Sequence, residues 1–559
     1  MTRRARESGM TTRLARTGVA ACVVAIALAG CVGIPRSGGV NAGPLVGADE
    51  KSQFVEQPVG PHRGETRDEI LSDFMQAVVS SDNDYGIARL YLTTGAAQVW
   101  DPTKSVLVRE GSATTEDDAN GSILYTVNTK AFIDDSGIYS EQSTVSGQSL
   151  SFSFEKVAGQ WRISDLSNGI VIARDNLTRA FTAQSLYFFD PSFHFLVPDV
   201  RWFPTGATVP TRIVNALLGG PSPLLQGGVV VSAIPQGIKQ QKAVEVHAGT
   251  AVVDLSSDAA NLKPPVQAQV LRQLQSSLLS PSITGVSLSV AGAPLQVSPA
   301  SANVAISVDS AALVLKGKKF GYWPKLTDIG QLSSQVTALN PLAVAVGRDQ
   351  KTAAILAKNG VYLASPASPA AALVDSRKNL IAPSIDPYGY VWSVPANDAS
   401  AIRVSGPSGS GHAVVSTLPS HSKIVSLQVS HDGTRVLLYL KTSAGPELLV
   451  AGVVRRTGNV PSSLGTPLSL PVSSAEPIDA TWVDSYSVAA LGESGGADTV
   501  ISYEIGGSGG DPSTPVAAEH IVGGNGSLRL ITSDDEVYQL RSSGWQELGV
   551  TAALLATQQ

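Results

Sequence analysis

The chain has 559 residues, of which 43% are hydrophobic and 15% are charged, and its formal net charge is −6. Nucleic-acid binding needs a clustered basic surface, so this dilute, acidic composition excludes nucleic acid as an expected partner. The length indicates about three or four domains. At this low charge, 53 glycines and 33 prolines favour β-rich extracellular domains over helical ones.

The N-terminus has the organisation of a bacterial export signal. Five arginines precede an apolar run of about 14 residues from Gly18 to Cys31. An uncleaved transmembrane helix is the alternative, but it needs about 20 apolar residues. The run ends in Leu28-Ala29-Gly30-Cys31, which resembles a lipobox, the motif whose cysteine is diacylated, freed from the signal and N-acylated. We therefore predict a signal peptide over residues 1–30 and lipid attachment, as N-palmitoyl and S-diacylglycerol groups, at Cys31.

Cysteine usage agrees with export, because the only cysteines are Cys22, inside the signal, and Cys31. The mature chain then has no free thiol and no disulfide, and its domains depend on ordinary hydrophobic cores. Without the +4 charge of the signal, the formal charge falls from −6 to −10, which argues against adhesion to anionic lipid. The acyl chains, with about 0.8 kcal/mol for each buried methylene, are the expected membrane contact on the extracytoplasmic face.

A Gly-, Pro- and Ser-rich segment over residues 31–64 is predicted to be a flexible, lipidated tether, with a partner-binding segment as the alternative. An α+β domain follows over residues 65–180. Its first helix carries apolar residues from Ile70 to Val78, and a second short helix is expected to end near Gly95. Strand-like runs then occupy 105–109, 123–133, 150–154 and 160–166.

This order of helix, helix and curved antiparallel sheet resembles the NTF2-like fold. Enzymes of that fold use a polar dyad, usually with a histidine, inside the cone of the sheet. No histidine lies between His62 and His194. We therefore expect this domain to be structural or protein-binding.

A second α+β domain is predicted over residues 184–300. A hairpin around Asp190-Pro191 is followed by a helix, two strands, a second helix and a last strand over 285–290. This order, with landmarks such as Val253-Asp-Leu-Ser256, resembles the GerMN domain, which implies envelope assembly or binding without established catalysis. Asp254 is a candidate ligand or catalytic carboxylate, but its place at a strand end favours a capping role.

Aromatic residues are concentrated in the first part of the GerMN-like segment. We predict that most of them belong to the core and that a few form a recognition surface, since aromatics are favoured at interfaces. They are Tyr187, Phe188, Phe189, Phe193, Phe195, Trp202 and Phe203.

Residues 302–559 are predicted to form an all-β domain. Five similar modules recur about every 40 to 55 residues, which indicates a β-propeller, with an irregular β-sandwich array as the alternative. Their tight turns lie at 347–349, 386–389, 431–433, 483–485 and 523–526. The turns Asp386–Gly389 and His431–Gly433 resemble those of TolB-like blades. We predict five or six degenerate blades, one of them closed by strands near Val314 and the C-terminus.

No catalytic, cofactor-binding or metal-ligating constellation emerges from the sequence. The seven histidines lack the paired spacing of a zinc site, so surface or turn positions are expected. They are His62, His194, His247, His412, His421, His431 and His520. Gly406–Gly411 fits neither a nucleophile elbow nor a P-loop, and together with Gly506–Asp511 it is interpreted as a flexible loop. The acidic turn 534–536 lacks the ligand pattern of a calcium loop. The chain is therefore predicted to be a non-enzyme without cofactor or metal.

The chain resembles the LpqB-type lipoproteins of actinobacteria, which have a lipobox, an NTF2-like domain, a GerMN domain and a propeller in this order. The likeness includes Cys31-Val-Gly-Ile-Pro35 and the segments 186–191, 196–201 and 382–384. The resemblance implies a lipoprotein that binds the extracellular region of an MtrB-like sensor histidine kinase and modulates signalling that affects cell-wall homeostasis and division. It carries over no functional residue besides Cys31. Two alternatives stay open: an envelope scaffold or glycan-binding lipoprotein without kinase contact, and an envelope hydrolase with carboxylates in the propeller channel.

Overall fold

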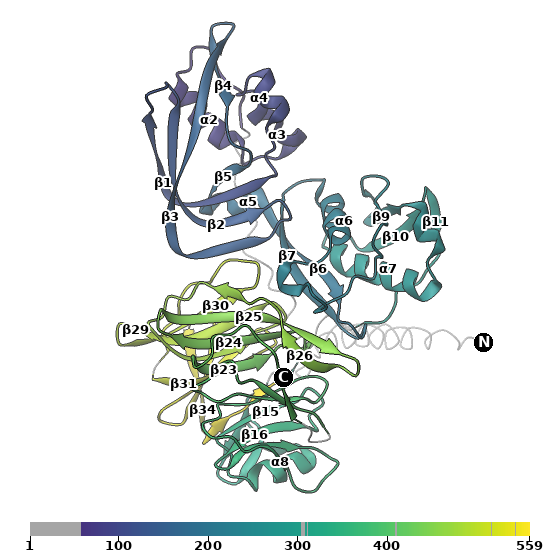
Figure 1. Ribbon diagram of the computed structural model, residues 1–559, viewed down its shortest axis with the longest axis vertical. Helices are drawn as coiled ribbons and strands as arrows, with labels where there is room; N and C mark the ends of the chain where they lie inside the picture. Colours follow the sequence, from purple (N-terminus) through teal and green to yellow (C-terminus); the bar gives the residue numbers. More distant parts are fainter. Residues whose placement is uncertain (1–57, 303–307, 310, 408–410, 516, 543) are drawn as a thin grey trace, which may run out of the picture. The chain divides into compact units, whose positions relative to one another are not determined.

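A computed structural model describes residues 58–302, 308–309, 311–407, 411–515, 517–542 and 544–559. The predicted signal peptide, Cys31 and most of the predicted tether lie outside these residues. The described chain is multidomain, with two α+β domains followed by an all-β domain (Figure 1). None of the described helices combines the length and the apolar character needed to cross a membrane.

Three helices begin the first domain: α2 (Arg67–Ala77), α3 (Asp82–Arg89) and α4 (Thr94–Val99). Helix α2 starts in a capping box, in which Thr66 and Glu69 exchange side-chain to backbone hydrogen bonds. The prediction of one helix ending near Gly95 is wrong. The chain leaves the helical conformation after Arg89, because the backbone on either side of Leu92 pairs with Ile163, through Thr93 N and Tyr91 O at 2.9 Å each. A new helix then begins with Thr93 as its N-cap.

The sheet of the first domain has the order β4-β3-β2-β1-β5. Its strands are β1 (Ser105–Asp117), β2 (Ile123–Asp134), β3 (Tyr139–Val157), β4 (Gln160–Asp165) and β5 (Ile170–Ala173). Strand β5, which lies parallel to β1, was not predicted from the sequence. This strand is only four residues long and three of them are buried, so it shows no alternation of apolar and polar residues.

The second domain combines a separate hairpin with a four-stranded sheet of order β11-β10-β9-β8. After α5 (Leu177–Ala180), its elements are β6 (Phe181–Phe189), β7 (Leu196–Pro204), α6 (Val209–Gly219), β8 (Glu245–His247), β9 (Thr250–Leu255), α7 (Pro264–Leu278), β10 (Gly285–Val290) and β11 (Ala293–Leu295). Strands β9 and β10 are parallel, and α7 is the crossover that a parallel pair requires. This is the predicted GerMN order, with a longer hairpin than expected.

The all-β domain is a propeller, as predicted, and its described residues form six small sheets. The first two blades contain β12 (Leu313–Lys316), β13 (Lys319–Tyr322), β14 (Thr327–Asp328), then α8 (Gly330–Thr337), β15 (Ala343–Val346), β16 (Ala353–Ala357), β17 (Gly360–Ala364) and β18 (Ala372–Asp375). The third and fourth contain β19 (Ser384–Ile385), β20 (Val391–Ser393), β21 (Arg403–Ser405), β22 (Gly411–Ala413), β23 (Lys423–Val429), β24 (Arg435–Thr442), β25 (Gly445–Arg456), β26 (Val460–Leu464) and β27 (Leu468–Leu470). The last two contain β28 (Glu476–Trp482), β29 (Ser487–Ser494), β30 (Ala497–Glu504), β31 (Ala518–Gly524), β32 (Ser527–Thr532), β33 (Glu536–Arg541) and β34 (Gly544–Thr551).

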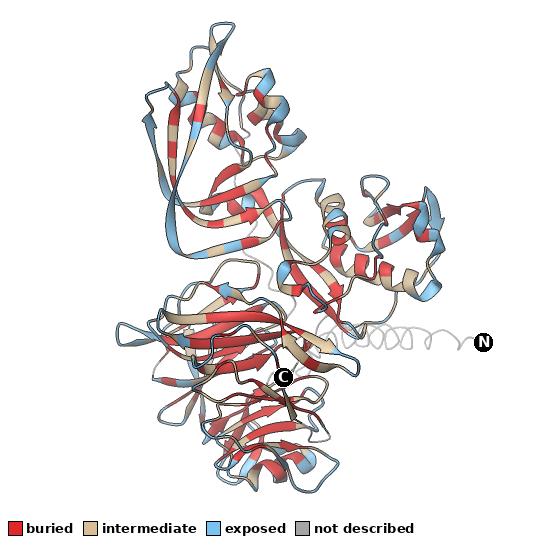
Figure 2. Ribbon diagram, viewed as in Figure 1, coloured by how far each residue is buried: buried red, intermediate tan, exposed pale blue. Residues whose placement is uncertain are grey.

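Each of the five predicted turns joins the first two strands of a blade. In the turn Asp386–Gly389, Asp386 Oδ1 accepts hydrogen bonds from the backbone N–H groups of Tyr388 and Tyr390. Gly389 has a φ of 81°, a conformation that favours glycine. Figure 2 shows that buried residues are concentrated on the strands of these blades, which carry the core.

The C-terminal residues close the propeller. Strand β35 (Leu554–Leu555) pairs with β12, as the sequence predicted, and β36 (Thr557–Gln558) lies parallel to β15. The buried side chain of Gln559 reaches a third blade, where its Oε1 accepts hydrogen bonds from Ser384 Oγ and Ile385 N, both at 2.7 Å. The last residues therefore lie among the first strands of several blades, on the propeller axis.

Replacing Gln559 by Ala should destabilise the propeller by about 1–3 kcal/mol, because it leaves two buried donors unpaired. Chemical denaturation of the two proteins measures this difference. Gln142→Ala, which removes an exposed glutamine from β3, is the matched control and should stay near wild type. Equal stability of Gln559→Ala and wild type would contradict the role given to the C-terminal side chain.

Candidate functional site

The hairpin β6–β7 forms a two-stranded sheet of its own, which is marginally stable unless other elements cover it. Every residue of β7 except Val200 is buried, instead of every second one. A strand buried on both faces needs neighbours on both sides. The neighbours of β7 come from the core of its own domain, from the first domain and from the propeller, so the hairpin is where the three domains meet.

Toward the first domain, β7 contacts the turn between β2 and β3. Trp202 N donates to Gly137 O at 2.8 Å, and Arg201 Nη1 donates to Ser136 O at 2.9 Å. The Trp202 ring packs on Tyr139 with 5.5 Å between ring centroids. A Cβ atom at Gly137 would lie 2.7 Å from the Trp202 carbonyl oxygen, so this close approach requires glycine.

Toward the propeller, β7 contacts the loop after β30. The indole Nε1 of Trp202 donates to Gly506 O at 2.8 Å. In the same loop, Gly509 N donates to Glu141 Oε2 of the first domain at 2.9 Å. Gly506–Asp511 is therefore an interdomain contact, and its interpretation as a flexible loop is wrong. Both partners lie at least 300 residues away in sequence, beyond the reach of any local pattern.

A buried ion pair occupies the middle of this junction. Arg201 and Asp199 are 3% and 5% exposed, and their side chains lie 2.8 Å apart. Asp199 also accepts a hydrogen bond from Ser222 N at 2.8 Å. Removing one partner of such a pair is strongly destabilising, because the other charge then stays buried and unpaired. The pair therefore fixes the position of β7 against its own domain.

The turn of the hairpin carries a second contact with the propeller. Asp190 is fully buried, and its Oδ2 accepts a hydrogen bond from the Tyr388 hydroxyl at 3.0 Å. Burial raises the pKa of Tyr388, so this hydroxyl stays protonated as a donor. The guanidinium of Arg455 lies 4.6 Å from the Tyr388 ring centroid and pairs with Asp386 at 2.8 Å. Two turns identified in the sequence thus bind each other.

Two cavities lie beside the Arg201–Asp199 pair. The larger, of about 480 Å³, is bounded by the first and second domains. Its lining combines aromatic and polar side chains, among them Tyr85, Trp202, Asp134, Arg212 and Asn215. The smaller, of about 280 Å³, is more apolar and is bounded by all three domains, with Tyr139, Leu224 and Ile505 among its residues. The larger cavity has the size and the mixed lining to hold a small polar molecule.

The structure assigns structural positions to the candidates named from the sequence. Burial disfavours the charged form of Asp254, but hydrogen bonds from Gly292 N at 2.9 Å and Ser289 Oγ at 2.7 Å outweigh it and lower the pKa. Asp254 therefore holds the turn after β10. Five of the seven aromatics are buried and two are half-buried; the buried ones are Phe188, Phe189, Phe195, Trp202 and Phe203. Trp202 also makes the interdomain contacts described above.

The propeller axis carries titratable side chains, but these are engaged within the fold. Asp432 pairs with Arg435, and Asp479 pairs with His520. Burial disfavours protonation of His520, yet Asp479 outweighs it and raises the His520 pKa. His431 lies near Gln558, with 3.4 Å between its Nε2 and the Gln558 carbonyl oxygen, and burial lowers the pKa of His431. The C-terminal residues lie beside these side chains: Gln558 is near His431, and Thr557 lines a small cavity together with Asp479 and His520.

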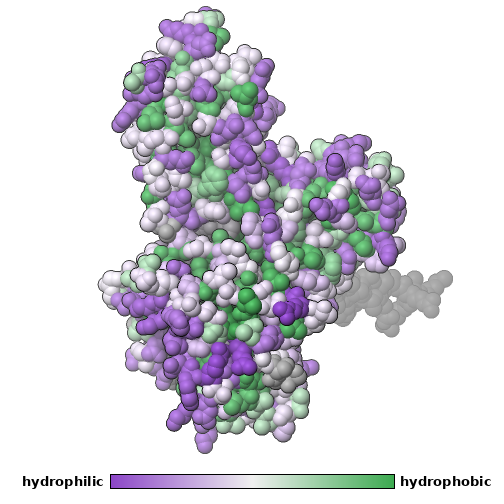
Figure 3. Space-filling view, in the orientation of Figure 1, coloured by the Kyte–Doolittle hydropathy of each residue, from purple (hydrophilic) through white to green (hydrophobic). Residues whose placement is uncertain are grey.

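On the face drawn in Figure 3, hydrophilic and hydrophobic side chains are interspersed. Exposed large hydrophobic residues of the described chain are spread over all three domains, for example Val99, Val246 and Val415. Scattered residues of this kind are normal on a soluble surface. Exposure alone therefore selects no docking surface.

Comparison with known proteins agrees with this architecture. Residues 60–178 match the LpqB lipoprotein N-terminal domain, residues 185–296 match a domain described as sporulation and spore germination, and residues 329–553 match the LpqB lipoprotein β-propeller domain. The lipoprotein LpqB of Cutibacterium acnes is 26% identical over 556 residues, which cover 89% of each chain. That of Streptomyces coelicolor is 25% identical over 590 residues, 92% of each chain.

The chain belongs to the LpqB lipoprotein family. Among solved structures, TolB from Acinetobacter baumannii is similar over 39% of this chain and 57% of its own, with 16% identity and a TM-score of 0.31. As an LpqB family member, the chain is a lipoprotein with a GerMN domain and a β-propeller domain. The predicted lipid attachment at Cys31 lies outside the described residues.

Replacing Tyr388 by Phe should weaken the contact between hairpin and propeller by about 1–3 kcal/mol, because the buried Asp190 loses a donor. Hydrogen–deuterium exchange should become faster in residues 190–195 and 386–390 together. Tyr390→Phe is the matched control, since its hydroxyl makes an exposed hydrogen bond of 3.5 Å to Gly458 O. Unchanged exchange in both segments of Tyr388→Phe would contradict this contact.

The stability of the propeller should fall in acid through His431. Burial disfavours the charged form of this imidazole in the folded protein, whereas the unfolded chain takes up a proton below pH of about 6.5. Between pH 8 and 5.5, wild type should therefore lose more unfolding free energy than His431→Gln. His520 contributes with the opposite sign in both proteins and cancels in the difference. Parallel pH profiles of the two proteins would refute this role of His431.

Proposed function

We propose that this LpqB family member is anchored by lipid at Cys31 on the extracytoplasmic face of the membrane, where it binds and modulates the extracellular region of a sensor histidine kinase. The signal peptide over residues 1–30 brings the chain there. Two or three acyl chains then hold it stably, whereas one holds only marginally. In this proposal the chain acts by binding and has no enzymatic activity.

The observation that best supports this proposal is the junction at β6–β7. A kinase responds to a bound protein only if that protein binds one of its states more tightly than the other. Domains held in fixed register by Trp202, Arg201 and Tyr388 present several surfaces to one partner at once. Anchoring strengthens binding to the kinase further, because it raises the effective concentration of these surfaces near the kinase.

Enzymatic function of the propeller has less support. The hydrolase alternative needs carboxylates that converge in an open channel. The carboxylates of Asp432 and Asp479 are instead paired with Arg435 and His520. The C-terminal strand β36 lies against the first strands at the axis.

Binding of a glycan is the second candidate function, and the larger cavity favours it. Aromatic rings beside carboxylate, amide and guanidinium groups can stack on a sugar ring and hydrogen-bond its hydroxyls. This function requires no kinase contact. Titration of the protein with soluble cell-wall fragments, for wild type and Trp202→Leu, distinguishes the two candidates.

Replacing Cys31 by Ala should release the protein from the membrane fraction and abolish its effect on kinase signalling, because no acyl chain can then be attached. Immunoblots of membrane and soluble fractions measure the first effect, and transcription of a kinase-dependent reporter measures the second. Cys22→Ala, the other cysteine of the chain, is the matched control and should stay membrane-bound. Normal signalling by the released Cys31→Ala protein would refute the tethering mechanism.

The kinase contact itself is tested by crosslinking in intact membranes, followed by detergent extraction and purification of the wild-type protein. We expect the kinase to co-purify with wild type and to be depleted with Cys31→Ala. If the kinase does not co-purify with correctly anchored wild type, the partner assignment is wrong.

A further inference from the structure

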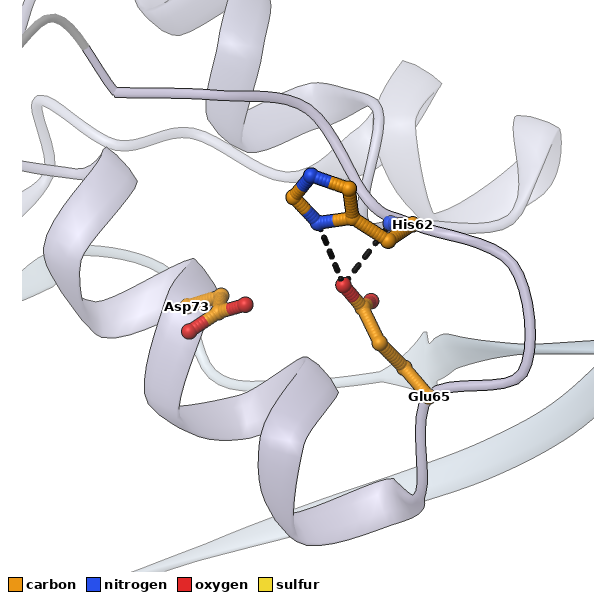
Figure 4. A group of neighbouring side chains, drawn as sticks. All are labelled: His62, Glu65 and Asp73. Atoms are coloured by element: carbon orange, nitrogen blue, oxygen red, sulfur yellow. Dashed lines mark hydrogen bonds and ion pairs between the residues drawn. The ribbon is translucent and has the colours of Figure 1, made fainter.

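The start of the first domain brings together three side chains of metal-ligand type. His62 lies in the segment before α2, Glu65 directly precedes the N-cap Thr66, and Asp73 lies on α2. One ligand atom from each residue lies within 4.8 Å of the others. Figure 4 shows the Glu65 carboxylate next to the His62 ring, with the Asp73 side chain on helix α2 beside them.

Glu65 has an incomplete set of hydrogen bonds. Its Oε1 accepts from His62 N at 2.7 Å and lies 3.0 Å from His62 Nδ1. Its Oε2 is buried and has no hydrogen-bond partner among the described residues, although the side chain is only 10% exposed. A buried carboxylate oxygen without a donor carries a large desolvation penalty. A cation at this oxygen would remove that penalty.

Asp73 adds a second negative group to the same place. Burial raises the pKa of Asp73, and the charge of Glu65 raises it further. A divalent cation would stabilise the two neighbouring carboxylates together, because its charge opposes both.

We propose that His62, Glu65 and Asp73 bind one divalent metal ion of the zinc type. One imidazole nitrogen and two carboxylates are suitable zinc ligands, held at about 2.0–2.2 Å, with a water in the fourth position. The His62 side chain is 68% exposed and is free to turn toward the ion. Carboxylates alone would suit magnesium or calcium, but the imidazole favours zinc.

The backbone around the site is already held in place. Tyr91 donates its hydroxyl hydrogen to Val59 O at 2.7 Å, and Gly64 N donates to Gln160 Oε1 at 2.7 Å. A metal ion would therefore add a bond between this segment and helix α2 without rearranging the chain. Since this segment is the last part of the predicted tether, the ion would strengthen the first domain at the point where the tether joins it. This set has no signature in the sequence, because a single histidine with two carboxylates lacks the paired-histidine spacing of a zinc site.

Titration calorimetry tests the site with the full-length, detergent-solubilised lipoprotein after removal of bound metal with a chelator. Zinc chloride is the ligand used. Wild type should bind one zinc ion per chain at this site, and Asp73→Asn and Glu65→Gln should each bind it at least about 10-fold more weakly. Asp68→Asn is the matched control, because Asp68 is exposed on the same helix outside the cluster. It should keep the affinity of wild type.

Thermal unfolding gives a second readout that separates metal binding from loss of folding. Zinc should raise the unfolding temperature of wild type and of Asp68→Asn, and it should raise that of Asp73→Asn and Glu65→Gln less at the same zinc concentration. If one of these two variants fails to fold in the presence of the chelator, the variant that folds is used to test the site. Zinc binding of equal affinity in wild type and a folded Asp73→Asn or Glu65→Gln would overturn the site, as would the absence of binding by wild type. Neither result depends on whether a kinase is the partner.

Discussion

The arrangement of the three domains depends on Trp202 and its neighbour Arg201 in strand β7. Their backbone and side-chain donors reach Gly137 and Ser136 on one side and Gly506 on the other. Each of these hydrogen bonds is modest in isolation, but the donors are buried, so leaving any of them unpaired costs about 1–3 kcal/mol. The hairpin β6–β7 and the three domains that cover it therefore stabilise one another.

The propeller depends on a different constraint, which is closure of its ring of blades. Pairing of β35 with β12 joins the last blade to the first, and β36 extends the chain along the axis. The C-terminal residues thereby satisfy backbone groups of the first strands.

The features of the fold that depend on neighbouring residues in the chain could be predicted from the sequence. The turn Asp386–Gly389 has the predicted role in the structure. Asp254 lies at a strand end as predicted, but it holds the turn after β10 and not the turn that follows its own strand. The split of the second helix, strand β5 and the contact of Gly506 with Trp202 depend on partners far along the chain. No window of the sequence contains both partners, so these features could not be predicted. The same holds for Glu65, whose burial no spacing reveals.

Hydrogen–deuterium exchange of the full-length lipoprotein, compared between wild type and Trp202→Leu, tests the central role of the junction most directly. The account predicts faster exchange at the same time in residues 134–140 of the first domain and 505–509 of the propeller, while the blade strands keep their protection. If exchange in residues 505–509 matches wild type while that in 134–140 rises, the propeller is not held through Trp202 and the account is contradicted.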